Sequence, residues 1–253
     1  MRILQISDTH QGITTRRAII TMLAGVRKKD FDVIVYCGDY SGGRVGAEMV
    51  LKTVDIIRAH FPKKPFVSVL GNHDYWVYKK NGRPSLKAYE SNYNKICAHF
   101  KENNIHFLDE DGFFQLKKFS DVIITGNSGW YLSLNPPTND GIYMPRAIEG
   151  NTHRWMEKRA RGKLFEQLDS VDKFYDKKKH SVVFVSHFPV IKGPDKKGRF
   201  EDFSWDANIG DMIQEDYGCK YFLNGHAHQK HHGPLRYETG SDYYNPKCQI
   251  ITV

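Results

Sequence analysis

The sequence lacks the features of membrane, disordered and disulfide-rich chains. No apolar run approaches the roughly 20 residues that a membrane-spanning helix needs. With 40% hydrophobic and 13% aromatic residues, the chain is too apolar to be disordered. Its four cysteines include no Cys-x-x-Cys pair, which argues against a zinc knuckle and a disulfide framework. The chain begins with a strand-like segment instead of a secretory leader, so we expect a cytoplasmic protein.

Acidic residues are in the minority, which bears on the partners of the protein. The 37 Lys and Arg residues exceed the 29 Asp and Glu residues, and the net charge is +8. Such an excess favours phosphate-rich partners but carries no information about the fold. The positive charges lie in short clusters, none long enough to be a nucleic-acid-binding tail: 27–29, 79–83, 158–163, 177–179 and 196–199. We interpret most of these clusters as solvated surface.

Apolar runs alternate with helical patterns over the first third of the chain. Strands are predicted at 3–7, 32–37 and 66–70, and helices at 15–29 and from about 49 to Pro62. The order strand-helix-strand-helix-strand implies parallel strands joined by right-handed crossovers. In such sheets, ligands bind at the loops that follow the carboxyl ends of the strands.

The remainder of the chain continues the same organisation. Helices are predicted at 85–103, 152–175 and 209–216, and strands at 106–108, 113–116, 122–125, 182–186, 221–223, 235–238 and 248–252. No internal repeat or low-complexity tract interrupts them. We therefore expect a single domain over residues 1–253, with loop insertions near 131–150 and 190–205.

Polar residues that can bind metals follow the ends of five predicted strands. They are Asp8 and His10, then Asp39, then Asn72, His73 and Asp74, then His187, and finally His226 and His228. The first three of these strands belong to one sheet and deliver their side chains to the same edge. Carboxylate, amide and imidazole ligands suit Mn²⁺, Fe and Zn²⁺, and the lack of thiolates argues against a soft metal.

This donor set favours a pair of metal sites. A carboxylate can bridge two ions, and Asp39 follows the central strand of the three, which makes it the natural bridge. Two ions about 3.5–4 Å apart clamp the attacking and the leaving oxygen of an in-line displacement and generate hydroxide near neutral pH.

These motifs resemble those of the calcineurin-like metallophosphoesterase superfamily. Its signature of Asp-x-His, Gly-Asp, Gly-Asn-His-(Asp/Glu), a lone His and Gly-His-x-His occurs here in the family's order, from Asp8 to His228. The resemblance implies an α/β fold in which a two-sheet β-sandwich, built from βαβ units, is flanked by helices. It also implies two divalent ions, with Mn²⁺ favoured and Fe, Zn²⁺ or Co²⁺ as alternatives. The implied reaction is hydrolysis of phosphodiesters or phosphomonoesters by a metal-bound hydroxide.

The resemblance also implies a role for each motif residue. The residues of the first metal would be Asp8, His10, Asp39 and His228. Those of the second metal would be Asp39, Asn72, His187 and His226. His73 would contact the phosphoryl oxygen or protonate the leaving group, and Asp74 would orient His73.

Departures from the signature narrow the family branch. The phosphoprotein phosphatases carry Gly-Asp-x-x-Asp-Arg-Gly, whereas the segment 38–44 here is Gly-Asp-Tyr-Ser-Gly-Gly-Arg and lacks the second aspartate. The segment also lacks the apolar-Phe-Asp continuation that is usual in double-strand-break repair nucleases. The pattern therefore favours a small phosphodiesterase or phosphatase. A non-catalytic scaffold that uses the fold for protein contacts is the alternative, and the complete set of motif residues disfavours it.

The substrate class is predicted from charge and aromatic residues. The basic segments 79–83 and 192–199 each follow a metal-ligand motif, where an anionic substrate would extend. This placement favours nucleotides or nucleic acid, including an end-processing nuclease, and indicates no membrane or obligate protein partner. Tyr75, Trp76 and Tyr78 belong either to the core or to a pocket wall that stacks on a base.

Overall fold

Two β-sheets form the centre of the computed structural model. It describes residues 1–42, 46–77, 85–130, 152–191, 206–228, 230–232, 235–241 and 243–253. Within these residues, the first sheet has five strands, in the order β11 (Cys248–Thr252), β1 (Arg2–Ile6), β2 (Val33–Cys37), β3 (Phe66–Val69) and β4 (Ile105–Phe107). The second has six, in the order β5 (Phe114–Leu116), β6 (Phe119–Gly126), β7 (Ser181–Val185), β8 (Tyr221–Asn224), β10 (Leu235–Thr239) and β9 (Lys230–His232).

The predicted strand-helix alternation is confirmed. Strands β1 to β4 are parallel, and α1 (Arg16–Ala24), α2 (Gly46–His60) and α4 (Leu86–Glu102) lie between them in the chain. Strands β6, β7, β8 and β10 also run parallel to one another. As a result, several strands of each sheet end at the same edge.

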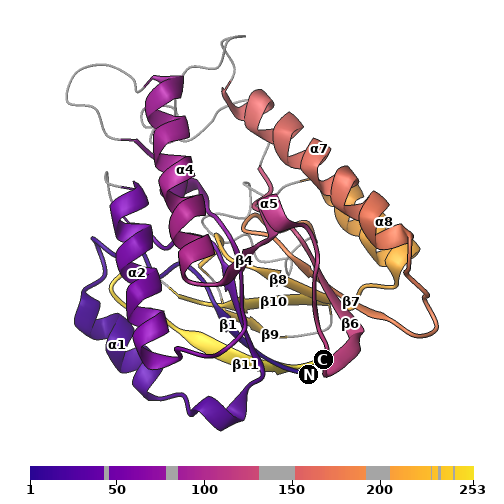
Figure 1. Cartoon of the computed structure of the whole chain (residues 1–253), viewed down its shortest axis with the longest axis horizontal. Coiled ribbons are helices and arrows are strands. Elements are labelled where there is room, and N and C mark those ends of the chain that lie inside the picture. Colours follow the sequence, from indigo (N-terminus) through magenta and orange to yellow (C-terminus); the bar gives the residue numbers. More distant parts are fainter. Residues whose placement is uncertain are drawn as a thin grey trace.

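Helices cover both outer faces of the pair of sheets. Helices α1, α2 and α4 lie on one side, and α7 (Thr152–Asp172) and α8 (Ala207–Tyr217) lie on the other (Figure 1). The two-sheet α/β sandwich flanked by helices, which the resemblance implied, is therefore confirmed. Among the described helices, none combines the length and the apolar character that a bilayer crossing requires.

The core has two kinds of apolar layer, and strand β2 contributes to both. Val33, Val35 and Cys37 face the layer between the sheets, whereas Ile34 and Tyr36 face the helices. This alternation follows from the two-residue period of a strand. Because the strand is buried on both faces, it is apolar throughout, and the polar residues Asp39 and Ser41 that follow it are buried as well.

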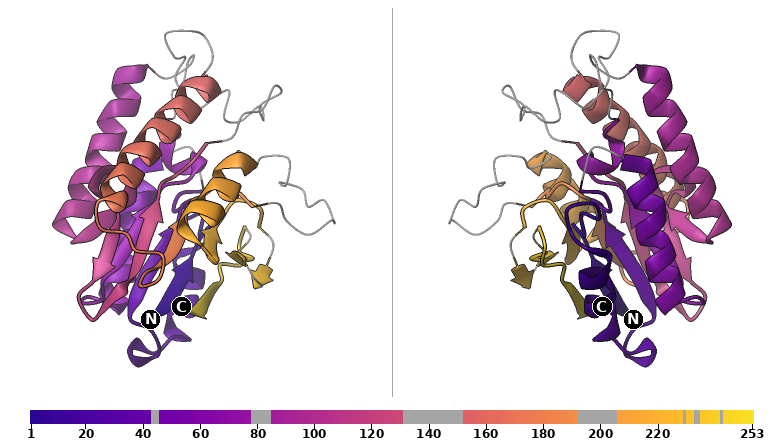
Figure 2. Two further views of the ribbon diagram at one scale, coloured as in Figure 1. Left: turned by 90° about the vertical axis from the view of Figure 1, so that its right-hand side faces the viewer. Right: turned by 90° about the vertical axis from the view of Figure 1, so that its left-hand side faces the viewer.

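The ends of the chain lie side by side in both views (Figure 2). The amino group of Met1 donates a hydrogen bond to the carbonyl oxygen of Val253 at 2.7 Å. Because Met1 immediately precedes β1, the termini lie at the opposite end of this strand from the residues that follow its carboxyl end.

Several element boundaries differ from the prediction. The helix expected at 15–29 begins after the cap residue Thr15 but ends at Ala24, where Gly25 caps it, and a short 3-10 helix, η1 (Lys28–Asp30), follows. Leu108 begins helix α5 (Leu108–Asp111) instead of ending a strand. Helix α3 (Asn72–Tyr75) and strand β9 were not expected, because elements of three or four residues show no periodic pattern.

Some predicted features lie outside the described residues. They are Tyr78, the basic segments 79–83 and 192–199, the expected insertion at 131–150 and most of the one near 190–205.

Candidate metal centre

The predicted site residues come together at one edge of the two sheets. Asp8 and His10 follow β1, Asp39 follows β2, and Asn72, His73 and Asp74 lie in α3 directly after β3. His187 follows β7 of the second sheet, and His226 and His228 follow β8. Strand β2 lies between β1 and β3, as expected from the sequence. Parallel strands from both sheets thus deliver all nine residues to a common place.

A first group of donors consists of Asp8, His10 and His228. The Nε2 atoms of His10 and His228 are 3.1 Å apart. Oδ1 of Asp8 lies 3.6 Å from Nε2 of His228 and 4.0 Å from Nε2 of His10. These spacings bring one ligand atom from each residue within 4.8 Å of the others, as a metal site requires.

A second group of donors lies on the other side of Asp39. Oδ2 of Asp39 is 3.8 Å from Nε2 of His10 and 3.5 Å from Nε2 of His187. Nε2 of His187 is in turn 3.2 Å from Oδ1 of Asn72, and the ring centroids of His187 and His226 are 5.2 Å apart. The Asp39 carboxylate therefore lies between the two groups.

The backbone at this edge is strained. Five of the predicted metal ligands have a positive φ: Asp8 (49°), His10 (44°), Asp39 (58°), His226 (69°) and His228 (56°). Residues other than glycine rarely adopt this region, and such strain, about 1–3 kcal/mol for each residue, concentrates at functional sites. Gly71 is required for a different reason, since a Cβ there would lie 2.1 Å from Oδ1 of Asp39.

Backbone carbonyls determine which ring nitrogen of two histidines faces the donor groups. Nδ1 of His187 lies 2.9 Å from the carbonyl oxygen of Cys37, and Nδ1 of His10 lies 3.3 Å from that of Ser41. A carbonyl only accepts, so each Nδ1 carries the proton and each Nε2 keeps a lone pair. These lone pairs face carboxylates, which are acceptors as well, and a cation among them would offset the repulsion.

Burial favours the neutral form of two of these histidines, His10 and His226, and the neutral imidazole is the form that binds metals. Burial, together with the neighbouring His73 and His228, holds the pKa of His10 well below its usual value. Burial also lowers the pKa of His226 strongly, and His187 and His228 lower it further. The donor types, their spacing and their protonation thus all fit a divalent metal.

The carboxylate of Asp74, which was expected to orient His73, is hydrogen-bonded to the backbone around it. It accepts backbone N–H bonds from Gly71, Asp39 and Ser41, each at 2.9 Å. Within the described residues, it forms no hydrogen bond or ion pair with the imidazole of His73. Burial raises the pKa of Asp74 to about 7, while the backbone N–H bonds act in the opposite direction. Asp74 therefore ties the loop after β2 to the start of α3 and holds the backbone of Asp39.

His73 lies beside the donors and is almost completely buried. Its backbone N–H donates to Oδ1 of Asp39 at 3.0 Å, and its Nε2 is 3.9 Å from Oδ2 of the same residue. Burial and then the neighbouring His187 and His228 lower the pKa of His73 to about 3. Its Nδ1 finds no hydrogen-bond partner among the described residues.

The aromatic residues around the site are only partly as expected. Tyr75 belongs to the core, because its ring stacks on Tyr89 and its hydroxyl donates to Oγ of Ser128 at 2.9 Å. Tyr243 was missed, although its ring centroid lies 4.6 Å from that of His10 and 5.1 Å from that of His228. Its position in the sequence could have indicated this, because Tyr243 follows β10, and β10 runs parallel to β8, the strand that precedes His226 and His228.

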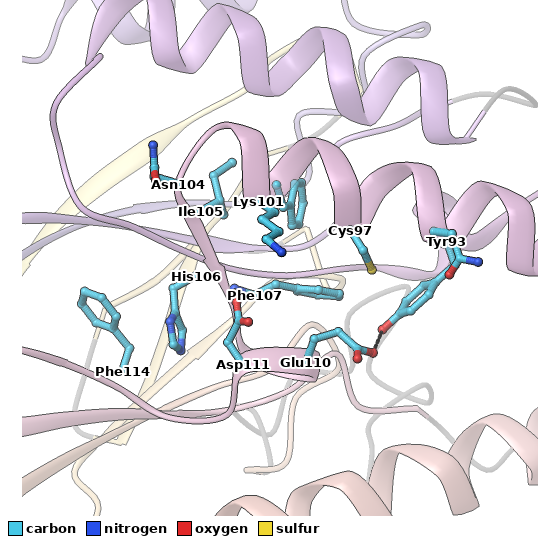
Figure 3. Close-up of a pocket in the computed structure, with 12 residues that line it drawn as sticks. Tyr93, Cys97, Lys101, Asn104, Ile105, His106, Phe107, Glu110, Asp111 and Phe114 are labelled. Atoms are coloured by element: carbon cyan, nitrogen blue, oxygen red, sulfur yellow. Dashed lines mark hydrogen bonds between the residues drawn. The ribbon is translucent and has the colours of Figure 1, made fainter.

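A separate cavity of about 740 Å³ lies among α4, β4, α5 and β5. None of the nine motif residues lines it. Figure 3 shows it, with the hydroxyl of Tyr93 hydrogen-bonded to Glu110. The metal centre is therefore distinct from this cavity.

Comparisons with known proteins bear on the whole chain. The family model described as calcineurin-like phosphoesterase matches residues 1–230. No curated protein matches the chain. Among solved structures, phosphopantetheinyl hydrolase (PptH) from Mycobacterium tuberculosis is similar with a TM-score of 0.67 and 14% identity, over 98% of this chain and 95% of that one. The protein TT1561 of Thermus thermophilus has a TM-score of 0.52 and 14% identity, over 88% of this chain and 80% of that one. At these identities the structural likeness shows the fold alone.

Proposed function

Because the chain belongs to the calcineurin-like phosphoesterase family, we propose that it hydrolyses phosphate esters with the help of two divalent metal ions. The observation that carries this proposal is the position of the Asp39 carboxylate between two groups of imidazole and oxygen donors. We further propose that residues 1–253 act as one domain, which the apolar layer shared by both sheets supports.

Each group of donors would hold one ion. Asp8, His10 and His228 would bind the first together with Asp39. Asn72, His187 and His226 would bind the second, again with Asp39. Mn²⁺ is the favoured ion, and Fe, Zn²⁺ or Co²⁺ are alternatives, because the donors are oxygen and imidazole nitrogen without thiolates.

The chain's own residues prepare this centre for hydrolysis. Ions bound there would supply Lewis acidity and lower the pKa of water. His73 would present its imidazole to the phosphoryl oxygen or to the leaving group, from its position beside Asp39. Asp74 would keep Asp39 in place through the backbone bonds that it accepts. The buried strand ends would hold all these groups before the substrate arrives.

The proposed substrates are phosphodiesters or phosphomonoesters of nucleotides or nucleic acid. The net charge of +8 supports an anionic substrate. The name of the similar structure, phosphopantetheinyl hydrolase, adds a phosphopantetheinyl ester to the compounds to be tested. The cytoplasmic location also stays a proposal, and the four free cysteines are compatible with it.

The test compares chelator-treated protein before and after addition of Mn²⁺. The panel contains p-nitrophenyl phosphate, bis-p-nitrophenyl phosphate, cyclic nucleotides, a phosphopantetheinyl ester and single-stranded oligonucleotides. We expect metal-dependent hydrolysis that Asp39→Asn abolishes and that Asp32→Asn, the same change near the opposite end of β2, leaves intact. Metal binding without hydrolysis of any compound would favour the scaffold alternative. Failure to bind metal would refute the proposal as a whole.

A further inference from the structure

The imidazole of His73 is held by aromatic contacts. Its ring stacks on the indole of Trp76, with centroids 3.8 Å apart and planes inclined by 25°. The ring of His10 meets it edge-on, with centroids 4.8 Å apart. Asp74, the neighbouring carboxylate, uses its oxygens to accept backbone N–H groups. A hydrogen-bonded carboxylate is the usual device that orients a catalytic imidazole, and this chain uses a different one.

The short helix α3 explains why Trp76 meets His73. Trp76 follows the last residue of the helix, and its backbone N–H donates to the carbonyl oxygen of His73 at 3.3 Å. Residues three apart on a helical turn present their side chains on the same side. The indole is only 5% exposed and packs into the apolar cluster beneath the helices. It is therefore a rigid wall behind the imidazole, and its stacked face is not available to a nucleobase.

We propose that Trp76 is the positioning residue of His73 and replaces an orienting carboxylate. The role rests on the proposed function, because His73 acts on the substrate of the metal centre. Stacking keeps the imidazole in one plane, since rotation of the ring would drive it into the indole. Stacking also offers no hydrogen-bond acceptor to Nδ1, so it holds the plane of the ring without fixing which ring nitrogen carries the proton.

Removing the indole is expected to leave the metal donors in place. Helix α3 is anchored independently of Trp76: Asp74 binds the loop after β2, and the hydroxyl of Tyr75 binds Ser128. The contacts of Asp39 with His10 and His187 do not involve Trp76 either. A loss of positioning can therefore be separated from a loss of metal.

The kinetic test uses Trp76→Leu and Trp76→Phe, alone and combined with His73→Ala. For a substrate with a poor leaving group, we expect Trp76→Leu to lower kcat about tenfold, equivalent to about 1.4 kcal/mol, with KM and metal content unchanged. Trp76→Phe keeps a ring in the stack and should lose less. The double variant Trp76→Leu/His73→Ala should be no slower than His73→Ala alone. The matched control is Trp155→Leu, which removes a half-buried indole on α7 and should leave kcat unchanged.

A second measurement needs neither metal nor substrate. In the metal-free protein, the ring-proton NMR signals of His73, identified by their absence from His73→Ala, should be shifted upfield by the indole. This shift should shrink in Trp76→Phe and vanish in Trp76→Leu. If Trp76→Leu does not fold, the Trp76→Phe variant, with and without His73→Ala, provides both the kinetic and the NMR comparison.

The outcomes separate this inference from the proposed function. An unshifted His73 signal in the wild type overturns the positioning role. So do losses that simply add in the double variant, and so does a Trp76→Leu variant with the kcat of the wild type. Wild-type protein that binds Mn²⁺ but hydrolyses nothing overturns the proposed function itself, and the positioning role with it.

Discussion

Asp39→Asn replaces the carboxylate between the two donor groups by an amide of the same shape. The amide oxygen can still accept the N–H of His73, which now lies 3.0 Å from Oδ1, so the fold should be retained. What is lost is the charge at Oδ2, which lies 3.5 Å from Nε2 of His187 and 3.8 Å from that of His10. A pair of unit charges about 4 Å apart contributes about 4 kcal/mol at an effective dielectric constant of about 20, which is roughly a thousandfold in affinity. Bound metal should therefore fall from about two ions per chain to one or fewer.

Metal analysis after gel filtration measures this loss, and thermal unfolding provides an independent reading. A ligand at about one hundred times its Kd stabilises a protein by about 2.7 kcal/mol, and 1 kcal/mol corresponds to about 2–4 °C for a chain of this size. Mn²⁺ should thus raise the Tm of the wild type by about 5–11 °C for each of the two ions bound, and the total rise for Asp39→Asn should be half that of the wild type or less. Asp32→Asn, which alters a carboxylate bonded to the backbone of Arg2, should respond like the wild type. If Asp39→Asn retains two ions, Asp39 is not a bridge and the reasoning fails.

Four further predictions concern His73, the glycines and the basic segments. His73→Ala should keep its metal but lose about 10²–10⁴-fold in rate, most for poor leaving groups; an equal loss for good and poor leaving groups would leave only electrostatic stabilisation to this residue. The lowered pKa of His73, about 3 against a usual 6.5, means that below pH 6.5 the unfolded chain takes up a proton that the folded chain refuses. Metal-free wild type should therefore lose stability faster than His73→Ala as the pH falls, by about 1.4 kcal/mol per pH unit, and equal slopes in urea titrations would contradict this. Gly71→Ala should displace Asp39 and abolish metal binding. Gly162→Ala is the control: an added Cβ there meets nothing within 4 Å, so the change should raise the unfolding free energy by about 1 kcal/mol. A Gly71→Ala variant that still binds metal would show that the site tolerates a shift. The KM for an oligonucleotide should rise with salt more steeply than the KM for an aryl phosphate, and replacing the basic residues of segment 196–199 by Ser should remove the difference; identical salt responses before and after the change would make these residues solvated surface.

The arrangement of strands and long helices was predictable because burial imposes it on every residue of the element. Strand β2 is apolar at each position from Val33 to Cys37, and Gly38 follows directly. Helix α4 begins after Ser85, whose hydroxyl accepts the N–H of Ala88, and ends at Glu102 with Asn103 as its cap, close to the bounds that the sequence indicated. The α1 boundary was wrong because the apolar spacing continues to Val26, whereas Gly25 caps the helix at Ala24. A capping glycine can outweigh a helical period that runs on past it.

Residue types and their order along the chain determined the candidate donors, because each follows a strand that ends at the same edge. Which donors meet depended on the tertiary structure. The 3.1 Å approach of His10 and His228 joins the first strand of one sheet to a late strand of the other, and no local pattern encodes that distance. Neighbours along the chain were also misleading, since Asp74 is adjacent to His73 but turns to the backbone of Gly71, Asp39 and Ser41. Trp76 contacts the imidazole instead, because only the folded helix α3 presents side chains three residues apart on one side.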